Sequence, residues 1–373
     1  MTRCLVCHEE TGLAEVLPIC PSCLRAKLDG VAEIVQNAHK WRSDLFELPE
    51  TIPQDEKGIQ CKVCANECRV PTNGIGYCGL RKNQNGQLVQ KVSASMGLMH
   101  YYLDPHITNC CGSYFCPGGT GAGYPKWAKK AQPEYGYSNL AVFFYGCNLD
   151  CLFCQNVSHK QITQGIGVHL DDFLSVIEQN PKISCICYFG GSPEPQLPFA
   201  IRVMEACKTR FENRVLRQCF EMNGQGNPRL VKRTGQLVEE SGGIIKFDLK
   251  AYSDAIYQAL CGIPKRATFD NFTMLADSLP FDDREYPPLM ATTLLVPYYV
   301  DEFEVTKIAR FLKGLNQPSI EYSLLVFHPR HLMRDLPITP LDQVQRCYDA
   351  VKRELGKPPH VGNLWLLRGR LQL

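Results

Sequence analysis

Three cysteines in one short loop are the strongest chemical signal in this sequence. Their spacing is C-x3-C-x2-C, and Cys147, Cys151 and Cys154 come directly after an apolar run. A [4Fe-4S] cluster ordinarily takes four thiolates, so three from one loop leave one iron free for an outside ligand. We therefore predict a reaction site built on an iron–sulfur cluster. The alternative is a structural zinc loop, for which His159 is the candidate fourth ligand.

A second set of cysteines has enough thiols to complete a metal site by itself. Its spacing is C-x2-C-x3-C-x9-C, and its members are Cys61, Cys64, Cys68 and Cys78. Four thiolates suit either a closed [4Fe-4S] cluster or zinc. We expect an auxiliary iron–sulfur cluster or a zinc ion here, and an electron relay and a structural role both fit this pattern.

The third set consists of two CxxC pairs near the start of the chain. They are Cys4 with Cys7 and Cys20 with Cys23. This arrangement is typical of a zinc ribbon or a rubredoxin, in which four thiolates hold one tetrahedral ion. We expect zinc or a mononuclear iron at this site, because the spacing fits both. The ion would fold a segment too short to be stable alone.

The remaining cysteines form weaker patterns. Cys110, Cys111 and Cys116 lie near His106 and lead into a glycine-rich run over residues 117–123. We expect this loop to cover the substrate or to contribute a cluster ligand. Most of the others are expected to be small core residues, although Cys219 and Cys261 should face a pocket. These scattered cysteines are Cys185, Cys187, Cys207, Cys219 and Cys347.

Composition limits the possible partners and the compartment. Charged residues make up 21% of the chain and nearly balance, giving a formal charge of +2. This balance gives no support to nucleic acid or an acidic membrane as a partner. The first residues carry no apolar signal segment, and no apolar run reaches the length of a membrane span. We expect a cytoplasmic protein, where closely spaced cysteines indicate metal rather than disulfides.

The elements that would position these cysteines form a repeating pattern from residue 136 onward. Short apolar runs alternate with helical patterns in six β-then-α units, and an extra strand is expected over residues 363–367. Such a pattern favours an α/β fold with a parallel sheet, and six units suit a partial (β/α)6 barrel. Chemistry in such folds gathers at the C-terminal ends of the strands. The expected strands cover residues 140–145, 183–189, 216–221, 243–249, 290–296 and 320–326.

Three zones follow from these patterns. Residues 1–45 would form the zinc-ribbon or rubredoxin-like metal knuckle, with a partly helical stretch over residues 24–40. Residues 46–135 would form the Cys-rich auxiliary region, which begins with a linker over residues 46–57. Residues 136–373 would form the catalytic core.

The cysteine triplet also resembles a known signature. The aromatic Phe153 precedes the last cysteine, and the run from Gly146 to Asn156 is similar to the pyruvate formate-lyase activating enzyme branch of the radical SAM superfamily. This resemblance implies a radical SAM barrel over residues 136–373, a [4Fe-4S] cluster on the triplet, and S-adenosylmethionine (SAM) bound to the free iron.

The resemblance also assigns residues at successive strand ends to SAM. Gly190, Gly191 and Ser192 correspond to the family's segment for the SAM amino group, with Ser192 in place of an acid and Glu194 two positions further on. Glu221 and Asn223 match an acidic-x-Asn-Gly turn, and Asp248 and Lys250 match an Asp-Leu-Lys motif. By resemblance, Lys250 would bind the carboxylate or ribose, and His328 would lie against the nucleoside.

The function implied by the resemblance is reductive cleavage of SAM to a 5′-deoxyadenosyl radical. That radical would abstract hydrogen from a protein, peptide or small-molecule substrate, with a ferredoxin- or flavodoxin-type protein as the low-potential electron donor. The rival hypotheses are a multi-cluster electron-transfer protein and an activase of a glycyl radical enzyme. A metal-stapled nucleic-acid module is disfavoured by the near-neutral charge.

Overall fold

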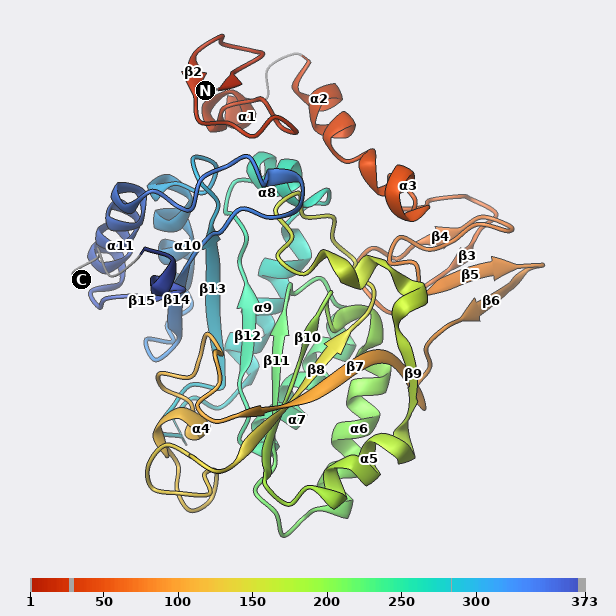
Figure 1. Cartoon of the computed structure of the whole chain (residues 1–373), viewed down its shortest axis with the longest axis vertical. Helices are drawn as coiled ribbons and strands as arrows, with labels where there is room; N and C mark the ends of the chain where they lie inside the picture. The colour runs from red at the N-terminus through yellow and green to blue at the C-terminus, as the bar shows by residue number, and fades with distance from the viewer. Residues whose placement is uncertain (1, 27–29, 283, 368–373) are drawn as a thin grey trace.

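A mainly parallel sheet dominates the structure, a computed structural model that describes residues 2–26, 30–282 and 284–367 (Figure 1). Its strand order is β15-β14-β13-β12-β11-β10-β8-β7-β9, a nine-stranded sheet in the described part of the chain. The neighbouring strands from β15 to β8 in this order pair in parallel. At the other edge, β7 pairs antiparallel with both β8 and β9. The predicted α/β fold is therefore confirmed, with the open sheet of a partial barrel.

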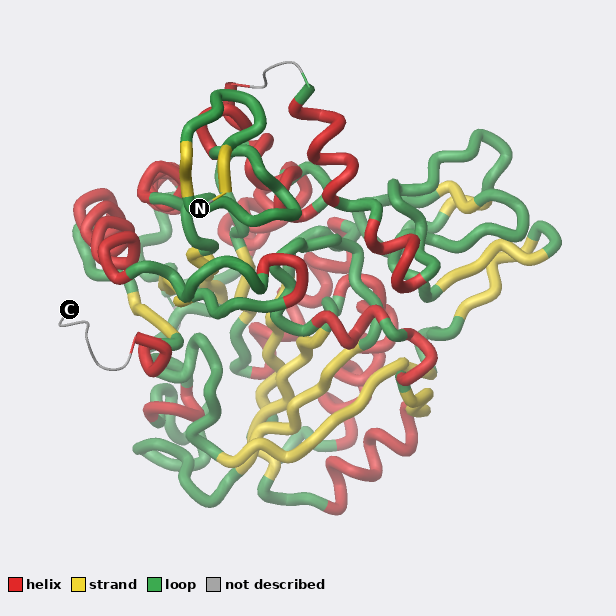
Figure 2. The backbone as a smooth tube through the Cα atoms, turned by 45° about the horizontal axis from the view of Figure 1, so that its top comes forward, coloured by secondary structure: helices red, strands yellow, loops and turns green. Residues whose placement is uncertain are grey.

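The six predicted β/α units are present, and their helices pack on the outer side of the sheet (Figures 1 and 2). The strands are mostly buried because both faces of the sheet are covered. The units are β8 (Ser138–Phe144) with α5 (Leu170–Gln179), β10 (Ile183–Gly190) with α6 (Leu197–Arg210), β11 (Arg217–Met222) with α7 (Pro228–Ser241), β12 (Ile245–Asp248) with α8 (Asp254–Cys261) and α9 (Arg266–Ser278), β13 (Leu289–Leu295) with α10 (Glu302–Gly314), and β14 (Glu321–Val326) with α11 (Leu341–Leu355).

The last strand lies earlier than predicted. β15 (His360–Gly362) pairs with β14, whereas residues Leu364–Leu367, part of the predicted strand, form a short 3-10 helix. The apolar residues of that helix suggested a strand, but sheet pairing ends at Gly362. The prediction of one extra strand was therefore right, but its position was wrong by a few residues.

Two strands of the sheet were not predicted. β7 (Met96–Pro105) comes from the Cys-rich zone, and its residues from Met99 to Pro105 pair antiparallel with β8. β9 (Ile166–His169) then pairs with β7. Several side chains of β7 are exposed, so its sequence lacks the continuous apolar run of the central strands. The Cys-rich zone is thus joined to the sheet by main-chain hydrogen bonds.

The N-terminal zone lies at the top of Figure 1, over the C-terminal ends of the strands. It contains the hairpin β1 (Thr2–Arg3) with β2 (Glu10–Thr11), and the helices α1 (Pro21–Ala26), α2 (Val31–Ala38) and α3 (Trp41–Phe46). Residues 27–29 of the expected helical stretch lie outside the described residues. The chain then forms two small hairpins, β3 (Ile59–Gln60) with β4 (Arg69–Val70) and β5 (Arg81–Gln84) with β6 (Gln87–Gln90).

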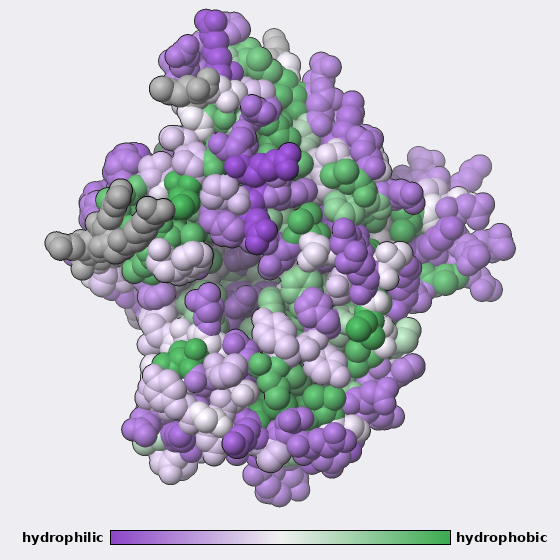
Figure 3. Space-filling view, in the orientation of Figure 1, coloured by the Kyte–Doolittle hydropathy of each residue, from purple (hydrophilic) through white to green (hydrophobic). Residues whose placement is uncertain are grey.

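The surface reflects this arrangement. The protruding β5–β6 hairpin is covered mostly by hydrophilic residues, and the face is hollowed near its centre between the upper and lower segments (Figure 3). Of the helices that the structure describes, none combines the length and apolar character that a bilayer crossing would need.

Candidate radical site

The cysteine triplet lies on the loop that follows β8, at the C-terminal end of the sheet. Cys147 is buried, and Cys151 and Cys154 are partly buried. All three line one cavity of about 200 Å3. A loop in this position is what a barrel enzyme uses to hold its reacting group.

The strand-end residues expected beside the triplet line the same cavity. They come from the triplet loop and from the ends of β10, β11 and β12, far apart in sequence. Parallel strands bring their C-terminal ends to one edge, which explains why these residues meet. They are Phe153, Gly190, Gly191, Ser192, Glu221, Asn223, Asp248 and Lys250.

His328 does not belong to this group. It follows β14 and is not among the described residues that line the cavity. Its carbonyl oxygen accepts a hydrogen bond from Gln155 Nε2 at 3.4 Å, so its main chain does contact the end of the triplet loop. Its expected position against a nucleoside stays a prediction.

The glycine pair brings the end of β10 against the triplet loop. The Gly191 amide donates to the carbonyl of Phe144 at 2.9 Å, and the Ser192 amide donates to Gly146 at 3.2 Å. A Cβ on Gly191 would lie 2.3 Å from the Gly146 oxygen and 2.6 Å from the His159 ring. Only glycine fits this approach, which leaves the main chain open toward the cavity.

Charged and polar groups also line this cavity. Lys250 Nζ lies 2.5 Å from Asp248 Oδ2, and Thr292 donates to the other oxygen of Asp248 at 2.5 Å. Burial opposes the charge on Lys250, but Asp248 and the nearby Cys151 and Cys261 sulfurs raise the pKa of this lysine well above its ordinary value. Lys250 is therefore a fixed cation beside the cysteines, suited to an anionic ligand group.

The carboxylate of Glu194 is held by hydrogen bonds within the protein. The residue is fully buried, and its carboxylate accepts the Gly224 amide at 2.6 Å and the Ser192 hydroxyl. Burial raises the pKa of Glu194 to about 7, although these hydrogen bonds act in the opposite direction. The acid displaced by two positions thus joins β10 to the turn after β11.

A network of buried charged groups surrounds Asp150 in the triplet loop. Asp150 lies between Cys147 and Cys151, and its carboxylate is 2.9 Å from both Lys160 Nζ and His39 Nδ1. Arg42 Nη1 is 3.5 Å away. Burial alone would raise the pKa of Asp150, but Lys160, His39 and Arg42 hold it well below its ordinary value. The N-terminal helices are therefore attached to the triplet loop through charged groups.

The distances between ligand atoms distinguish a site for a single metal ion from a site for a larger cluster. In the described part of the chain, two groups of residues bring their ligand atoms, one from each residue, within 4.8 Å of one another. One group is Cys4, Cys7, Cys20 and Cys23, and the other is Cys110, Cys111 and Glu221. A tetrahedral zinc holds its thiolates about 3.8 Å apart, given zinc–sulfur bonds of about 2.3 Å. The N-terminal set, with 3.8 Å between the Cys7 and Cys20 sulfurs, fits one such ion.

The triplet and the Cys61–Cys78 set do not form such a group among the described residues. His159 Nε2 lies 3.6 Å from the Cys154 sulfur, yet these two do not complete a single-ion site with Cys147 and Cys151. A four-iron cluster is larger than one ion and holds its thiolates farther apart. In the described part of the chain, the triplet with His159 therefore lacks the single-ion spacing that the zinc loop requires.

The Cys61–Cys78 set lies beside the triplet loop. All four thiols are buried. The Asn66 side chain donates to the Asn148 carbonyl at 2.9 Å, and the Ala65 amide donates to Gln225 at 2.9 Å. Burial raises the pKa of Cys68 to about 11, so a bound metal would be needed to keep this thiolate charged.

A second cavity, which the sequence did not predict, opens inside the barrel. Its volume is about 230 Å3, and Cys185, Cys187 and Cys219 line it together with the Cys110 loop. Cys185 and Cys187 are buried, as expected of small core residues, and they also line this cavity. Their alternation in β10 could have placed them on one face, but the sequence does not say which face points inward.

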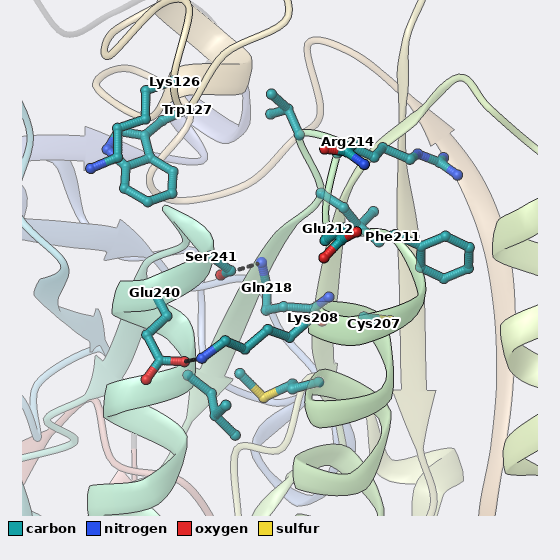
Figure 4. A pocket seen from close by; sticks show the side chains of 15 residues that line it. Lys126, Trp127, Cys207, Lys208, Phe211, Glu212, Arg214, Gln218, Glu240 and Ser241 are labelled. Carbon is teal, nitrogen blue, oxygen red and sulfur yellow. Dashed lines mark hydrogen bonds and ion pairs between the residues drawn. The ribbon is translucent and has the colours of Figure 1, made fainter.

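A third hollow lies on the outer side of the sheet. It measures about 360 Å3, and α6 and α7 contribute much of its lining (Figure 4). Lys208 pairs there with Glu240 at 2.9 Å, and the Gln218 amide donates to Ser241 at 3.0 Å. None of the predicted site residues lies among its described lining residues. It is therefore not the candidate site.

Comparison with known proteins agrees with the position of the triplet. Residues 141–312 match the radical SAM superfamily. Pyruvate formate-lyase 1-activating enzyme of Escherichia coli (strain K12) is 25% identical over 144 residues, which cover 36% of this chain and 55% of that enzyme. The enzyme of the same name from Shigella flexneri matches equally. The chain thus spans about half the length of the curated relatives it matches.

Two solved structures are similar over part of the chain. One is a domain of pyruvate-formate lyase-activating enzyme from Bacteroides vulgatus ATCC 8482, with a TM-score of 0.38, 17% identity, and coverage of 48% of this chain and 98% of that one. The other is Streptococcus suis SuiB bound to precursor peptide SuiA, with a TM-score of 0.46, 12% identity, and coverage of 60% and 48%.

Proposed function

We propose, from the premise that this chain belongs to the radical SAM superfamily, that it cleaves SAM reductively and directs the resulting radical at a bound substrate. One observation carries the proposal: the three cysteines share a cavity with the glycine pair, Asp248 and Lys250. The chemistry supplied by a bound cluster is one-electron reduction of SAM to methionine and a 5′-deoxyadenosyl radical, which abstracts hydrogen from a substrate.

The residues of the chain would divide the work of binding. Cys147, Cys151 and Cys154 would hold the cluster and leave one iron for SAM. The main chain at Gly190 and Gly191 would meet the SAM amino group, and Lys250 would meet its carboxylate or ribose. Phe153, whose ring centroid lies 5.8 Å from Lys250 Nζ, would limit access of water from that side.

The N-terminal zone would serve as the cover of this site. His39 and Arg42 contact Asp150 inside the triplet loop, and the Trp41 ring lies 5.4 Å from Lys160 Nζ. Exclusion of water and stray reductants protects a radical reaction. We propose that the Cys61–Cys78 set holds a second [4Fe-4S] cluster, since four thiolates suit one and no single-ion group includes them among the described residues. We also propose that the Cys4–Cys23 set holds zinc or iron.

The substrate is proposed as a protein, a peptide or a small molecule, with a ferredoxin- or flavodoxin-type protein as electron donor. Activation of a glycyl radical enzyme is the second candidate, favoured by the 25% identity to pyruvate formate-lyase 1-activating enzymes. Incubation with pyruvate formate-lyase, SAM and a reductant would give a glycyl radical signal in electron paramagnetic resonance if this candidate holds. Absence of that signal favours a different substrate.

The decisive experiment measures SAM cleavage. The protein, reconstituted with iron and sulfide and given dithionite and SAM, should release 5′-deoxyadenosine. Changing Cys147, Cys151 and Cys154 together to Ala should abolish this product. The matched control is Cys347→Ala, which removes a buried thiol from α11 and should leave the product unchanged.

The same assay separates the proposal from the electron-transfer hypothesis. A protein that only transfers electrons would keep its clusters but release no 5′-deoxyadenosine with any reductant. Counts of iron, sulfide and zinc on the Cys64→Ser variant would test the second cluster: loss of about four irons supports it. Loss of a single zinc would contradict it.

A further inference from the structure

Two adjacent cysteines, neither of which lines the triplet cavity, converge inside the barrel on Glu221, which lines both that cavity and their own. Cys110 and Cys111 lie on the loop after β7, and Glu221 lies on β11. One sulfur of each cysteine and one oxygen of Glu221 all lie within 4.8 Å of one another, and the Cys111 sulfur is 3.9 Å from Glu221 Oε1. Two sulfur atoms and one oxygen atom at these separations match the spacing of ligands around a single metal ion.

A buried lysine completes the surroundings of this group. Lys246 Nζ lies 2.9 Å from the Cys110 sulfur, 3.2 Å from Glu221 Oε1 and 3.5 Å from the Cys187 sulfur. Its side chain is 4% exposed. A buried ammonium is stable only among negative groups, so its position indicates that anionic sulfur and oxygen gather here.

We propose that Cys110, Cys111 and Glu221 bind one divalent ion of the zinc class. Two thiolates and a carboxylate carry three negative charges; Lys246 balances one, and the ion balances the other two. Thiolate and carboxylate ligands together suit zinc, and a site with three protein ligands keeps a fourth position open for water or substrate. Lys246 would then donate to the metal-bound Cys110 thiolate.

The position of the ion would place a substrate beside SAM. Glu221 lines the cavity of the cysteine triplet and also the cavity of about 230 Å3 that contains Cys110. A substrate group on the open coordination position would therefore lie at the boundary between the two cavities. This role rests on the proposed function, whereas the existence of the metal site does not.

Metal analysis of the full chain tests the site without any activity measurement. Zinc, iron and sulfide are counted on the purified wild type and on the Cys110→Ser, Cys111→Ser double variant. The expected result is a loss of one zinc per chain with iron and sulfide unchanged. The matched control changes Cys116 and Cys185 to Ser, two thiols of the same cavity that lie outside the proposed ligand group, and should keep that zinc.

A single substitution covers the case in which the double variant does not fold. Glu221→Gln keeps the shape of the side chain, and it should release this zinc at a chelator concentration about 10- to 100-fold lower than the wild type does. Equal zinc counts in wild type and double variant would overturn the proposal. So would a loss of iron and sulfide from the double variant, because the pair would then belong to a cluster.

Because SAM cleavage is measured separately, the two proposals can fail independently. A wild type that releases 5′-deoxyadenosine but carries no zinc dependent on Cys110 and Cys111 would overturn only the metal site. A wild type with that zinc but no SAM cleavage would overturn only the proposed function.

Discussion

The Asp150 carboxylate lies 2.9 Å from the Lys160 ammonium, and both side chains are buried at the centre of the triplet loop. His39 approaches the same carboxylate from the N-terminal helices, 111 residues away in sequence. The conformation of the loop that carries the three cysteines therefore depends on the Asp150 carboxylate and its partners, as well as on the cysteines.

Removing the charge of Asp150 should destabilise the protein. Asp150→Asn leaves Lys160 and Arg42 buried without a counter-charge, which costs about 3–5 kcal/mol of unfolding free energy. Urea unfolding followed by circular dichroism measures this loss. Asp342→Asn, which breaks an exposed pair with Arg346, should cost less than about 1 kcal/mol. Equal effects of the two changes would show that the Asp150 network is not structural.

A methyl group on Gly191 should separate the end of β10 from the triplet loop. The Cβ of Gly191→Ala would lie 2.3 Å from the Gly146 oxygen, so the loop must move. We expect a cost of about 1–3 kcal/mol and a loss of iron from the triplet site, measured by metal analysis. Gly314→Ala is the control: nothing lies within 4 Å of its Cβ, and iron content should not change. Full iron content in Gly191→Ala would contradict the close fit.

Lys250 should contribute strongly to SAM affinity. Lys250→Met removes a cation that faces the cavity, and loss of a charged hydrogen bond of about 1.5–3 kcal/mol should raise the Kd for SAM about 10- to 100-fold. Equilibrium dialysis with labelled SAM measures the change. Lys208→Met, which removes an exposed partner of Glu240 in the outer hollow, should leave the Kd unchanged. An unchanged Kd in Lys250→Met would remove this lysine from the binding site.

Glu194 should make stability fall as pH rises. Its folded-state pKa of about 7 lies above the ordinary value of 4.5, so the folded protein binds this proton more tightly than the unfolded chain does. The stabilising contribution is full below pH 4.5 and is lost as pH rises toward 7, by about 1.4 kcal/mol per pH unit at most.

Comparison with Glu194→Gln isolates this contribution. The variant cannot ionise, so its unfolding free energy relative to the wild type should increase between pH 5 and pH 8. Urea unfolding at several pH values gives both curves. Parallel curves for the two proteins would show that Glu194 keeps the same pKa in the folded and unfolded states.

Much of the fold followed from local patterns. The six central strands lie within a few residues of their predicted positions, and each is followed by at least one helix, as the alternating pattern predicted. Buried parallel strands are continuous apolar runs, which a sequence displays directly. β7 was missed because its exposed side chains interrupt such a run, and pairing with β8 rather than its own sequence holds it in the sheet.

The sequence by itself determined the spacings of the three cysteine sets and the resemblance of the triplet loop to the radical SAM signature, because these residues are close neighbours along the chain. Only the tertiary structure decided that Cys111 meets Glu221, 110 residues away, and that Cys185 and Cys187 face a cavity instead of the helices. Both faces of β10 carry mostly apolar residues, so composition cannot tell them apart; the curvature of the sheet around its interior does.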